Sequence, residues 1–361
     1  MQPLVSILIP AHNAEKTVAD AIQSAIAQTW PRKEIIVVDD GSTDRTAAII
    51  GRFVPAVRLI SSENHGLSAA VNLAFQHSHG DYIQELDADD LLTPDKIERQ
   101  LSALRPEDSK RTLLSSQLAR FYYRTGNAPF ENNALCQDLS PVEWFLRKMG
   151  QNLYMQNATW LVSRELVEAA GPWDTRLSYD QDGEYFARVI ACSTGTRFVP
   201  GTGVLYRASG PASVSHIGNS DSKKESLLLS IELQIQYLLT LENSERARRT
   251  CITYLQNWYE NFYLGRNDLA AQAQAMAAEL GGTLEEPRLR QKFAWLKPLF
   301  GWKIAQWAQR TLPCMKASLL RSIDKTMYTL EHSPTEMRPP SRQKLPNSAR
   351  SDQSAFEGRS L

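Results

Sequence analysis

The sequence lacks several features that mark whole classes of protein. It holds only four cysteines, Cys136, Cys192, Cys251 and Cys314. They lack the short spacing of a zinc site or a disulfide framework, so we expect the protein to be in a reducing compartment. Its 40 Lys and Arg balance 40 Asp and Glu, and this lack of a basic excess argues against a nucleic-acid partner. No apolar run approaches the roughly 20 residues that cross a bilayer. The start, MQPLVSILIPAHN, lacks the basic region of a signal peptide, so we expect a cytoplasmic protein.

What is present is the material for a substantial core. Of the 361 residues, 42% are hydrophobic, and strand and helix patterns alternate over the first hundred. Asn13 is the expected N-cap of the first helix. Unbroken apolar strands that alternate with helices predict a parallel sheet covered on both faces. The predicted strands are Val5–Ile9, Glu34–Val38, Val57–Ile60 and Tyr82–Leu86, and the helices are 13–30, 43–53, 66–76 and one from Thr93.

The rest of the chain changes character twice. Strands are predicted at Thr112–Tyr123, Ala158–Val162 and Gly203–Tyr206, and helices after Ser140 and at Asp182–Ala191. From about residue 222 long helical patterns dominate, and near residue 331 Pro, Ser, Arg and Asn take over. We therefore expect a domain over 1–218, a helical region over 219–330 and a disordered tail over 331–361.

Polar residues follow three of the predicted strands. They are Pro10–Glu15 (PAHNAE), Asp39–Ser42 (DDGS) and Leu86–Asp90 (LDADD). Ligands bind at the carboxyl ends of strands in open α/β sheets, so the three segments could form one site. Each alone also has an ordinary explanation as a helix cap or a solvated turn.

Taken together, the segments resemble a specific family. VSILIPAHNAE, EIIVVDDGSTDRT, NHGLSAAVNLAF and GDYIQELDADDLLTP, in this order and spacing, are similar to the family 2 glycosyltransferases over residues 4–104. A weaker resemblance continues through GPWDTRLSYDQDGEYFARV at 171–189. The resemblance implies the GT-A fold, a Rossmann-like, mostly parallel α/β sheet with helices on both faces. It also implies a nucleotide-diphosphate sugar donor, a divalent metal and inversion at the anomeric carbon.

The resemblance also suggests roles for individual residues. Asp89 matches a metal ligand, and Mn²⁺ or Mg²⁺ suits such hard oxygen donors. Strand alternation predicts that Asp87 and Asp89 point to the same side. Asp39 matches the contact to the base of a UDP-, dTDP- or GDP-sugar, whereas Asp40 orients the turn or caps the helix over 43–53. The other residues expected to bind the nucleotide sugar are Pro10, Ala11, Asn13, Glu15, Asn72, Asp87 and Ala88.

An inverting displacement also needs a base for the acceptor hydroxyl. By resemblance QDGEYFAR selects Asp182 as this catalytic residue, and the alternative is that Asp182 only caps the helix at Gly183–Ala191. The acceptor is expected to be a sugar or a lipid-linked sugar, in a pathway to a cell-surface polysaccharide or glycolipid.

Two further segments have more than one interpretation. His216 could reach the metal and Arg207 the diphosphate, or both could be exposed loop residues. Residues 288–325 hold nine Lys and Arg, one acid and three Trp. This composition suits either a helix lying on the inner leaflet of a membrane or a packed helix with a basic, solvated face.

One departure from the family leaves other functions open. Val71 stands where many relatives carry Arg, which favours a non-catalytic GT-A module that binds or scaffolds a partner. A nucleotidyltransferase shares a related sheet but usually has a Gly-rich, basic loop after its first strand, where this chain has PAHNAE.

Overall fold

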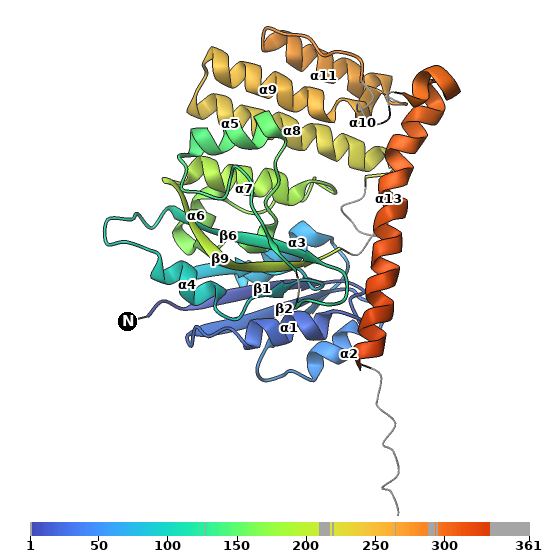
Figure 1. Ribbon diagram of the computed structural model, residues 1–361. Coiled ribbons are helices and arrows are strands. Elements are labelled where there is room, and N and C mark those ends of the chain that lie inside the picture. The colour runs from blue at the N-terminus through green and yellow to red at the C-terminus, as the bar shows by residue number, and fades with distance from the viewer. Residues whose placement is uncertain are drawn as a thin grey trace, which may run out of the picture.

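The computed structural model describes residues 2–126, 128–208, 217–218, 220–263, 265–287, 293 and 295–332. Two sheets lie below a layer of helices, and one long helix, α13, runs along the side of both (Figure 1). No helix within these ranges is apolar over a stretch long enough to cross a membrane.

The larger sheet has five strands in the order β3-β2-β1-β4-β8, and its first four are parallel, as predicted. Buried β-branched and leucine side chains on β1 and β2 let helices cover both faces. The strands are β1 (Val5–Ala11), β2 (Lys33–Asp40), β3 (Arg58–Ser62), β4 (Tyr82–Glu85) and β8 (Val162–Ser163). The helices between them are α1 (Val18–Ile26), α2 (Thr46–Gly51), α3 (Leu67–Gln76) and, after the short β5, α4 (Lys96–Ser102).

The first helix begins later than predicted, so the assignment of Asn13 as its N-cap is wrong. Helix α1 starts at Val18 and its N-cap position is Thr17. Asn13 instead has a positive φ of 49°, a conformation that asparagine tolerates. Its side-chain oxygen accepts a hydrogen bond from the backbone N–H of Thr43 at 2.9 Å, so it joins the β1–α1 loop to the β2–α2 loop.

The second sheet has four strands in the order β5-β9-β6-β7, built around the parallel pair β6 and β9. Its members are β5 (Leu91–Leu92), β6 (Thr112–Phe121), β7 (Phe130–Glu131) and β9 (Gly195–Arg207), so the strands expected at 112–123 and 203–206 are present. The strand expected at Ala158–Val162 is wrong for most of its length. A 3₁₀ turn, η1 (Asn157–Thr159), occupies its start, and β8 begins only at Val162.

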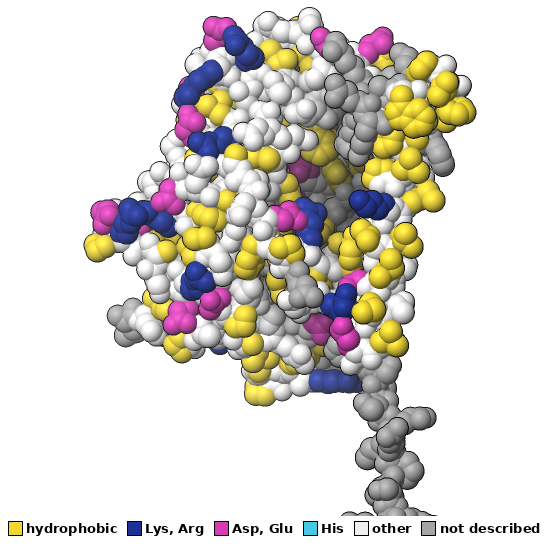
Figure 2. Space-filling view, in the orientation of Figure 1, with side chains coloured by type: hydrophobic (Ala, Val, Ile, Leu, Met, Phe, Trp, Pro, Cys, Tyr) yellow, Lys and Arg dark blue, Asp and Glu magenta, His cyan; other side chains and the backbone are white. Residues whose placement is uncertain are grey.

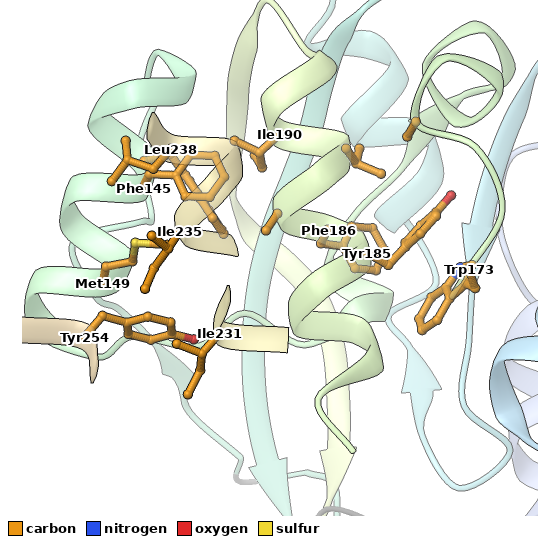
Figure 3. Close-up of a cluster of buried hydrophobic side chains, with 14 of the residues drawn as sticks. Phe145, Met149, Trp173, Tyr185, Phe186, Ile190, Ile231, Ile235, Leu238 and Tyr254 are labelled. Atoms are coloured by element: carbon orange, nitrogen blue, oxygen red, sulfur yellow. The ribbon is translucent and has the colours of Figure 1, made fainter. Parts of the chain in front are cut away.

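The helical layer shares one hydrophobic core with the larger sheet. Phe145 and Met149 of α5 face Ile235 and Leu238 of α8 and Tyr254 of α9 (Figure 3). The same cluster of buried side chains continues to β1 and β2. The layer comprises α5 (Pro141–Gln151), α6 (Arg164–Ala170), α7 (Gln181–Cys192), α8 (Asp221–Leu241), α9 (Glu245–Trp258), α10 (Glu260–Tyr263) and α11 (Asn267–Glu279), and α13 spans Leu296–His332. Of the expected tail, residues 333–361 lie outside the described ranges.

The approach of β9 to β6 generates a prediction about stability. A Cβ at Gly203 would lie 1.8 Å from the backbone oxygen of Gln117, where the register of the two strands shifts. We expect Gly203→Ala to lower the free energy of unfolding by about 3 kcal/mol, because backbone cannot move aside as a side chain can. Gly51→Ala is the matched control, since nothing lies within 4 Å of a Cβ there. Denaturant unfolding that gives the two variants equal stability would contradict this packing.

Candidate active site

The carboxyl ends of three neighbouring strands bring the predicted polar segments together. Ala11 at the end of β1 pairs with Asp39 on β2, and β1 pairs on its other side with β4, whose last residue is Glu85. The turn Asp87–Asp90 follows β4 directly. PAHNAE, DDGS and LDADD therefore lie at one edge of the sheet, as a ligand site in an open α/β fold requires.

The two adjacent aspartates of β2 have different surroundings. Asp39 is 5% exposed, and its Oδ1 is buried without a hydrogen-bond partner among the described residues. Such an oxygen can receive a donor from a bound ligand, because leaving it unpaired is costly. Asp40 accepts hydrogen bonds from the backbone N–H groups of His65 and Gly66, both at 2.9 Å. Asp40 therefore holds the entry to α3, and the alternative that it caps the helix after DDGS is wrong.

The PAHNAE segment lies against the loop that follows β2. Pro10 and Ala11 are buried on β1. Glu15 forms an ion pair with Arg45, with the Arg45 Nε 3.1 Å from its carboxylate. Together with the Asn13–Thr43 bond, this pair sets the shape of the loop beside Asp39.

The LDADD segment is a turn and not an extension of the strand. The backbone N–H of Asp90 donates to the carbonyl of Asp87 at 3.1 Å, so the expectation that strand alternation aligns Asp87 with Asp89 is wrong. Asn157 donates to one oxygen of Asp87 at 2.9 Å, and Gln156 donates to the other at 3.2 Å. Burial, with the nearby charge of Asp89, raises the pKa of Asp87 to about 7.

Arg207 connects this turn to the end of β9. Its backbone N–H donates to Asp90 Oδ1 at 2.8 Å, and its Nε donates to the carbonyl of Asp89 at 2.8 Å. Asp90 is fully buried, and Gln156 donates to its other oxygen at 2.9 Å. Burial raises the pKa of Asp90 well above its usual range. A guanidinium thus lies against the acidic turn, and Arg207 is not an isolated loop residue.

Asp182 lies in the first turn of α7, close to the same group of acids. The N-cap position of α7 is Asp180, so Asp182 does not cap this helix. The hydroxyl of Tyr154 donates to Asp182 Oδ2 at 3.0 Å. Burial, together with the charge of Asp180, raises the pKa of Asp182 to about 6. In turn, the charge of Asp182 contributes to the raised pKa of Asp87.

Glu85 is a further member of the group that the sequence analysis did not identify. It is 6% exposed, the indole N–H of Trp173 donates to its Oε1 at 3.0 Å, and its Oε2 is buried without a partner among the described residues. Burial, reinforced by Asp87 and Asp182, raises the pKa of Glu85 well above its usual value. Its signal in the sequence is a glutamate near the end of a strand that is otherwise buried.

The donor set fits a divalent metal that the substrate helps to bind. No group of three or more His, Cys, Asp or Glu placed to hold a metal occurs among the described residues, and His216 lies outside them. Mg²⁺ and Mn²⁺ commonly take one or two carboxylates and complete their shell with phosphate oxygens and water. The Asp87–Asp89 turn offers such carboxylates at the sheet edge.

Asn72 is placed differently from the other expected site residues. Its side-chain oxygen accepts from the backbone N–H of Trp173 at 2.8 Å, and its amide donates to the carbonyl of Trp173 at 3.0 Å. Both ends of the side chain therefore join α3 to the segment before α7. Its role in donor binding stays a prediction for which this geometry gives no basis.

The bridging position of Asn72 can be tested by substitution. We expect Asn72→Ala to lower the free energy of unfolding by about 2 kcal/mol, because two hydrogen bonds to buried backbone are lost. Gln76→Ala on the exposed side of the same helix is the control, with an expected change within about 0.5 kcal/mol. Unchanged stability combined with weaker nucleotide-sugar binding would instead favour the ligand role.

The chain is similar in sequence to known glycosyltransferases. The model of the family described as Glycosyl transferase family 2 matches residues 6–127. An uncharacterized glycosyltransferase of Rickettsia prowazekii (strain Madrid E) is 39% identical over 199 residues, or 53% of this chain and 60% of that protein. Chondroitin synthase of Escherichia coli is 43% identical over 108 residues, or 29% of this chain and 16% of that enzyme. The chain thus spans less than two thirds of the length of these relatives.

Solved structures confirm the expected fold. S. aureus TarS 1–349, crystallised with UDP-GlcNAc, aligns with a TM-score of 0.62 over 85% of this chain and 92% of that chain, at 16% identity. At this identity the match establishes the fold alone, a mostly parallel GT-A sheet followed by a helical C-terminal region. The N-terminal part of the chain, residues 6–127, is therefore similar to glycosyl transferase family 2, and the structure has the fold of TarS 1–349.

Proposed function

We propose that the protein transfers a glycosyl group from a nucleotide-diphosphate sugar to an acceptor hydroxyl, with inversion. The proposal rests on the close grouping of Asp182, Glu85 and Asp87. The charge of Asp182 contributes to the raised pKa values of Glu85 and Asp87, and the pKa of Asp182 is itself raised by burial and by Asp180. A displacement on a sugar diphosphate requires a base for the attacking hydroxyl and, beside it, carboxylates that attract a cation.

The nucleotide end of the donor fits beside β1 and β2. The buried, unpaired Oδ1 of Asp39 can accept the imide N–H of uracil or thymine, or an N–H of guanine. Pro10 and Ala11 form the neighbouring apolar wall, and Asn13 and Glu15 shape the loop above it. Because the solved TarS structure holds UDP-GlcNAc, uridine donors are the first to test.

The diphosphate fits at the Asp87–Asp90 turn. Asp89, with Asp87 beside it, would hold Mn²⁺ or Mg²⁺, which when bound offsets the negative charge that grows on the leaving diphosphate. Gln156 and Asn157 orient Asp87, and Ala88 keeps the turn small. Arg207 adds a fixed positive charge, which compensates for Val71, a residue buried in the core where relatives carry Arg.

Asp182 is the proposed general base. With a pKa of about 6 it is ionised near neutral pH, yet it is basic enough to take the proton of a hydroxyl as that oxygen attacks the anomeric carbon. The Tyr154 hydroxyl donates to one oxygen of this carboxylate and so helps to orient it. A single displacement from the side opposite the diphosphate inverts the configuration.

The acceptor we propose is a sugar, free or linked to a lipid, used on the cytoplasmic side in building a cell-surface polysaccharide or glycolipid. The likeness to chondroitin synthase supports a polysaccharide. A non-catalytic module would have no need for a base of tuned pKa, and a nucleotidyltransferase would have no need for Asp182 opposite the leaving group.

Replacing the proposed base should separate binding from catalysis. We expect Asp182→Asn to lower the release of nucleoside diphosphate from a sugar nucleotide by about 10²- to 10⁴-fold, because the amide cannot accept the proton. The affinity for the donor should stay within about threefold, since Asp182 faces the acceptor. Release is followed with Mn²⁺ and a panel of UDP-, dTDP- and GDP-hexoses, and affinity by calorimetry.

Asp221→Asn provides a matched control, because Asp221 is likewise an acid in the first turn of a helix, but at the start of α8. The wild-type rate should also fall as the pH drops through about 6, because the raised pKa leaves the base protonated there. Burial and the charge of Asp180 raise the pKa of Asp182, and the hydrogen bond from Tyr154 lowers it. The charge of Asp182 in turn raises the pKa values of Glu85 and Asp87.

Removing the expected metal ligand should abolish metal-linked binding. We expect Asp89→Ala to lose at least about tenfold of the donor affinity that Mn²⁺ confers on the wild type, since the carboxylate supplies one of few protein ligands. Calorimetric titration of UDP-GlcNAc with Mn²⁺ and with EDTA gives both values. A wild-type affinity that is the same in Mn²⁺ and EDTA would refute the metal site.

A further inference from the structure

A line of apolar side chains on α13 faces solvent. Figure 2 shows hydrophobic side chains gathered along the outer edge of this helix, at the side of the molecule. Their exposed fractions range from 42% to 68%, whereas single exposed apolar residues are scattered elsewhere. We call the following residues the apolar stripe: Leu312, Met315, Leu319, Ile323, Met327 and Leu330.

The spacing of the apolar stripe places it on one face of α13. Successive members are three or four residues apart, so they stack along one side of a helix with 3.6 residues per turn. The repeat holds over five turns, which distinguishes the stripe from isolated exposed leucines. A continuous apolar face of this kind marks a surface that another phase or molecule covers.

An adjoining face of the helix, about 100° around its axis, is fixed to the domain. Asp324 accepts hydrogen bonds from Arg124 Nε at 2.7 Å and from the backbone N–H of Tyr123 at 2.9 Å. Arg124 also donates to Glu331 at 2.9 Å, and the rings of Tyr123 and Tyr328 lie 6.1 Å apart. These contacts hold α13 in one rotation about its axis, with the apolar stripe turned outward.

The charges beside the apolar stripe identify the covering partner. Lys316 is exposed and lies within the stripe, four residues after Leu312 and three before Leu319. The sequence of α13 contains six Lys and Arg but only two acids, Asp324 and Glu331, both bonded to Arg124. A second copy packed on this face would bring the Lys316 side chains of both molecules to the interface, with no acid on the stripe to pair them. An anionic lipid surface would accept both the Lys316 ammonium and the apolar side chains.

We propose that α13 is a membrane-docking helix that lies in the plane of an anionic lipid surface. The apolar stripe enters the boundary between head groups and acyl chains, and the stem of Lys316 reaches up so that its ammonium meets lipid phosphate. Trp295 and Phe300 are also exposed, and they lie ahead of the stripe, before the kink at Gly301, where φ is 78°. They add aromatic side chains of the kind that such boundaries favour.

The position of α13 brings this surface close to the candidate active site. Tyr123 and Arg124 follow the end of β6, where Phe121 pairs with Arg207 of β9, and the side chain of Arg207 reaches Asp89. A docked helix would therefore hold the acidic turn beside the lipid surface. This consequence, access to a lipid-linked acceptor, rests on the proposed function, whereas lipid binding itself does not.

Flotation of the full chain with vesicles tests the proposal. One vesicle preparation contains phosphatidylcholine alone and the other contains phosphatidylglycerol in addition. We expect the wild type to float with the anionic vesicles, less so at high salt, and to stay in solution with the neutral ones. Leu319→Asp with Ile323→Asp should lower partitioning to the anionic vesicles at least about tenfold. Leu241→Asp, at the exposed end of α8, is the matched control and should float as the wild type does.

Two results would overturn the proposal. One is equal recovery of the wild type and the double variant with anionic vesicles. The other concerns the mass measured by light scattering without lipid. If the wild type has the mass of a dimer and the double variant that of a monomer, the stripe binds a second copy instead of lipid. Donor binding by calorimetry is measured on the same samples. If the double variant loses flotation but still binds the donor, the effect lies in α13 and not in the active site. If the wild type floats but binds no donor, the proposed function is wrong and the docking proposal stands.

Discussion

The crowding of carboxylates at the end of β4 is the constraint on which much of the structure depends. Glu85, Asp87, Asp90 and Asp182 carry like charges in a poorly hydrated space, and each has a raised pKa. Such a group is stable only if hydrogen-bond donors surround it. The chain supplies these donors from separate segments, through Gln156 and Asn157, Tyr154, Trp173 and Arg207.

This requirement explains the irregular middle of the chain. Residues 156 and 157 must turn two successive side chains toward the acids, and a strand would send them to opposite faces. The 3₁₀ turn η1 meets the requirement, and β9 ends where the Arg207 backbone and side chain both reach the acidic turn. Local structure that looks arbitrary from its own sequence is therefore set by partners about 70 to 120 residues away.

The sequence predicted the sheet well because its strands are continuous β-branched runs, such as Glu34–Val38, that have few alternatives to a buried parallel strand. The family resemblance singled out Asp182 and the acidic turn, and the structure brings Asp182 close enough to Asp87 for their charges to interact. Local patterns failed where a residue serves a distant partner: Asn13 resembles a helix cap but joins Thr43, and Asn72 is taken up by Trp173. Tyr154, Gln156 and Glu85 were missed because single polar residues carry no periodic signal.

The start of α7 shows how closely α8 is joined to the group of buried carboxylates. Asp180, at the N-cap position, accepts hydrogen bonds from Ser230 at 2.6 Å and Gln234 at 2.9 Å, both on α8, and Asp182 follows two residues later. Removing α8 would leave the buried carboxylate of Asp180 without these two donors and would expose Phe145 and Met149 of α5, which face α8 (Figure 3). The helical layer is thus not a detachable module, since any change in α8 that moves Ser230 or Gln234 would also shift the start of α7, and with it Asp182.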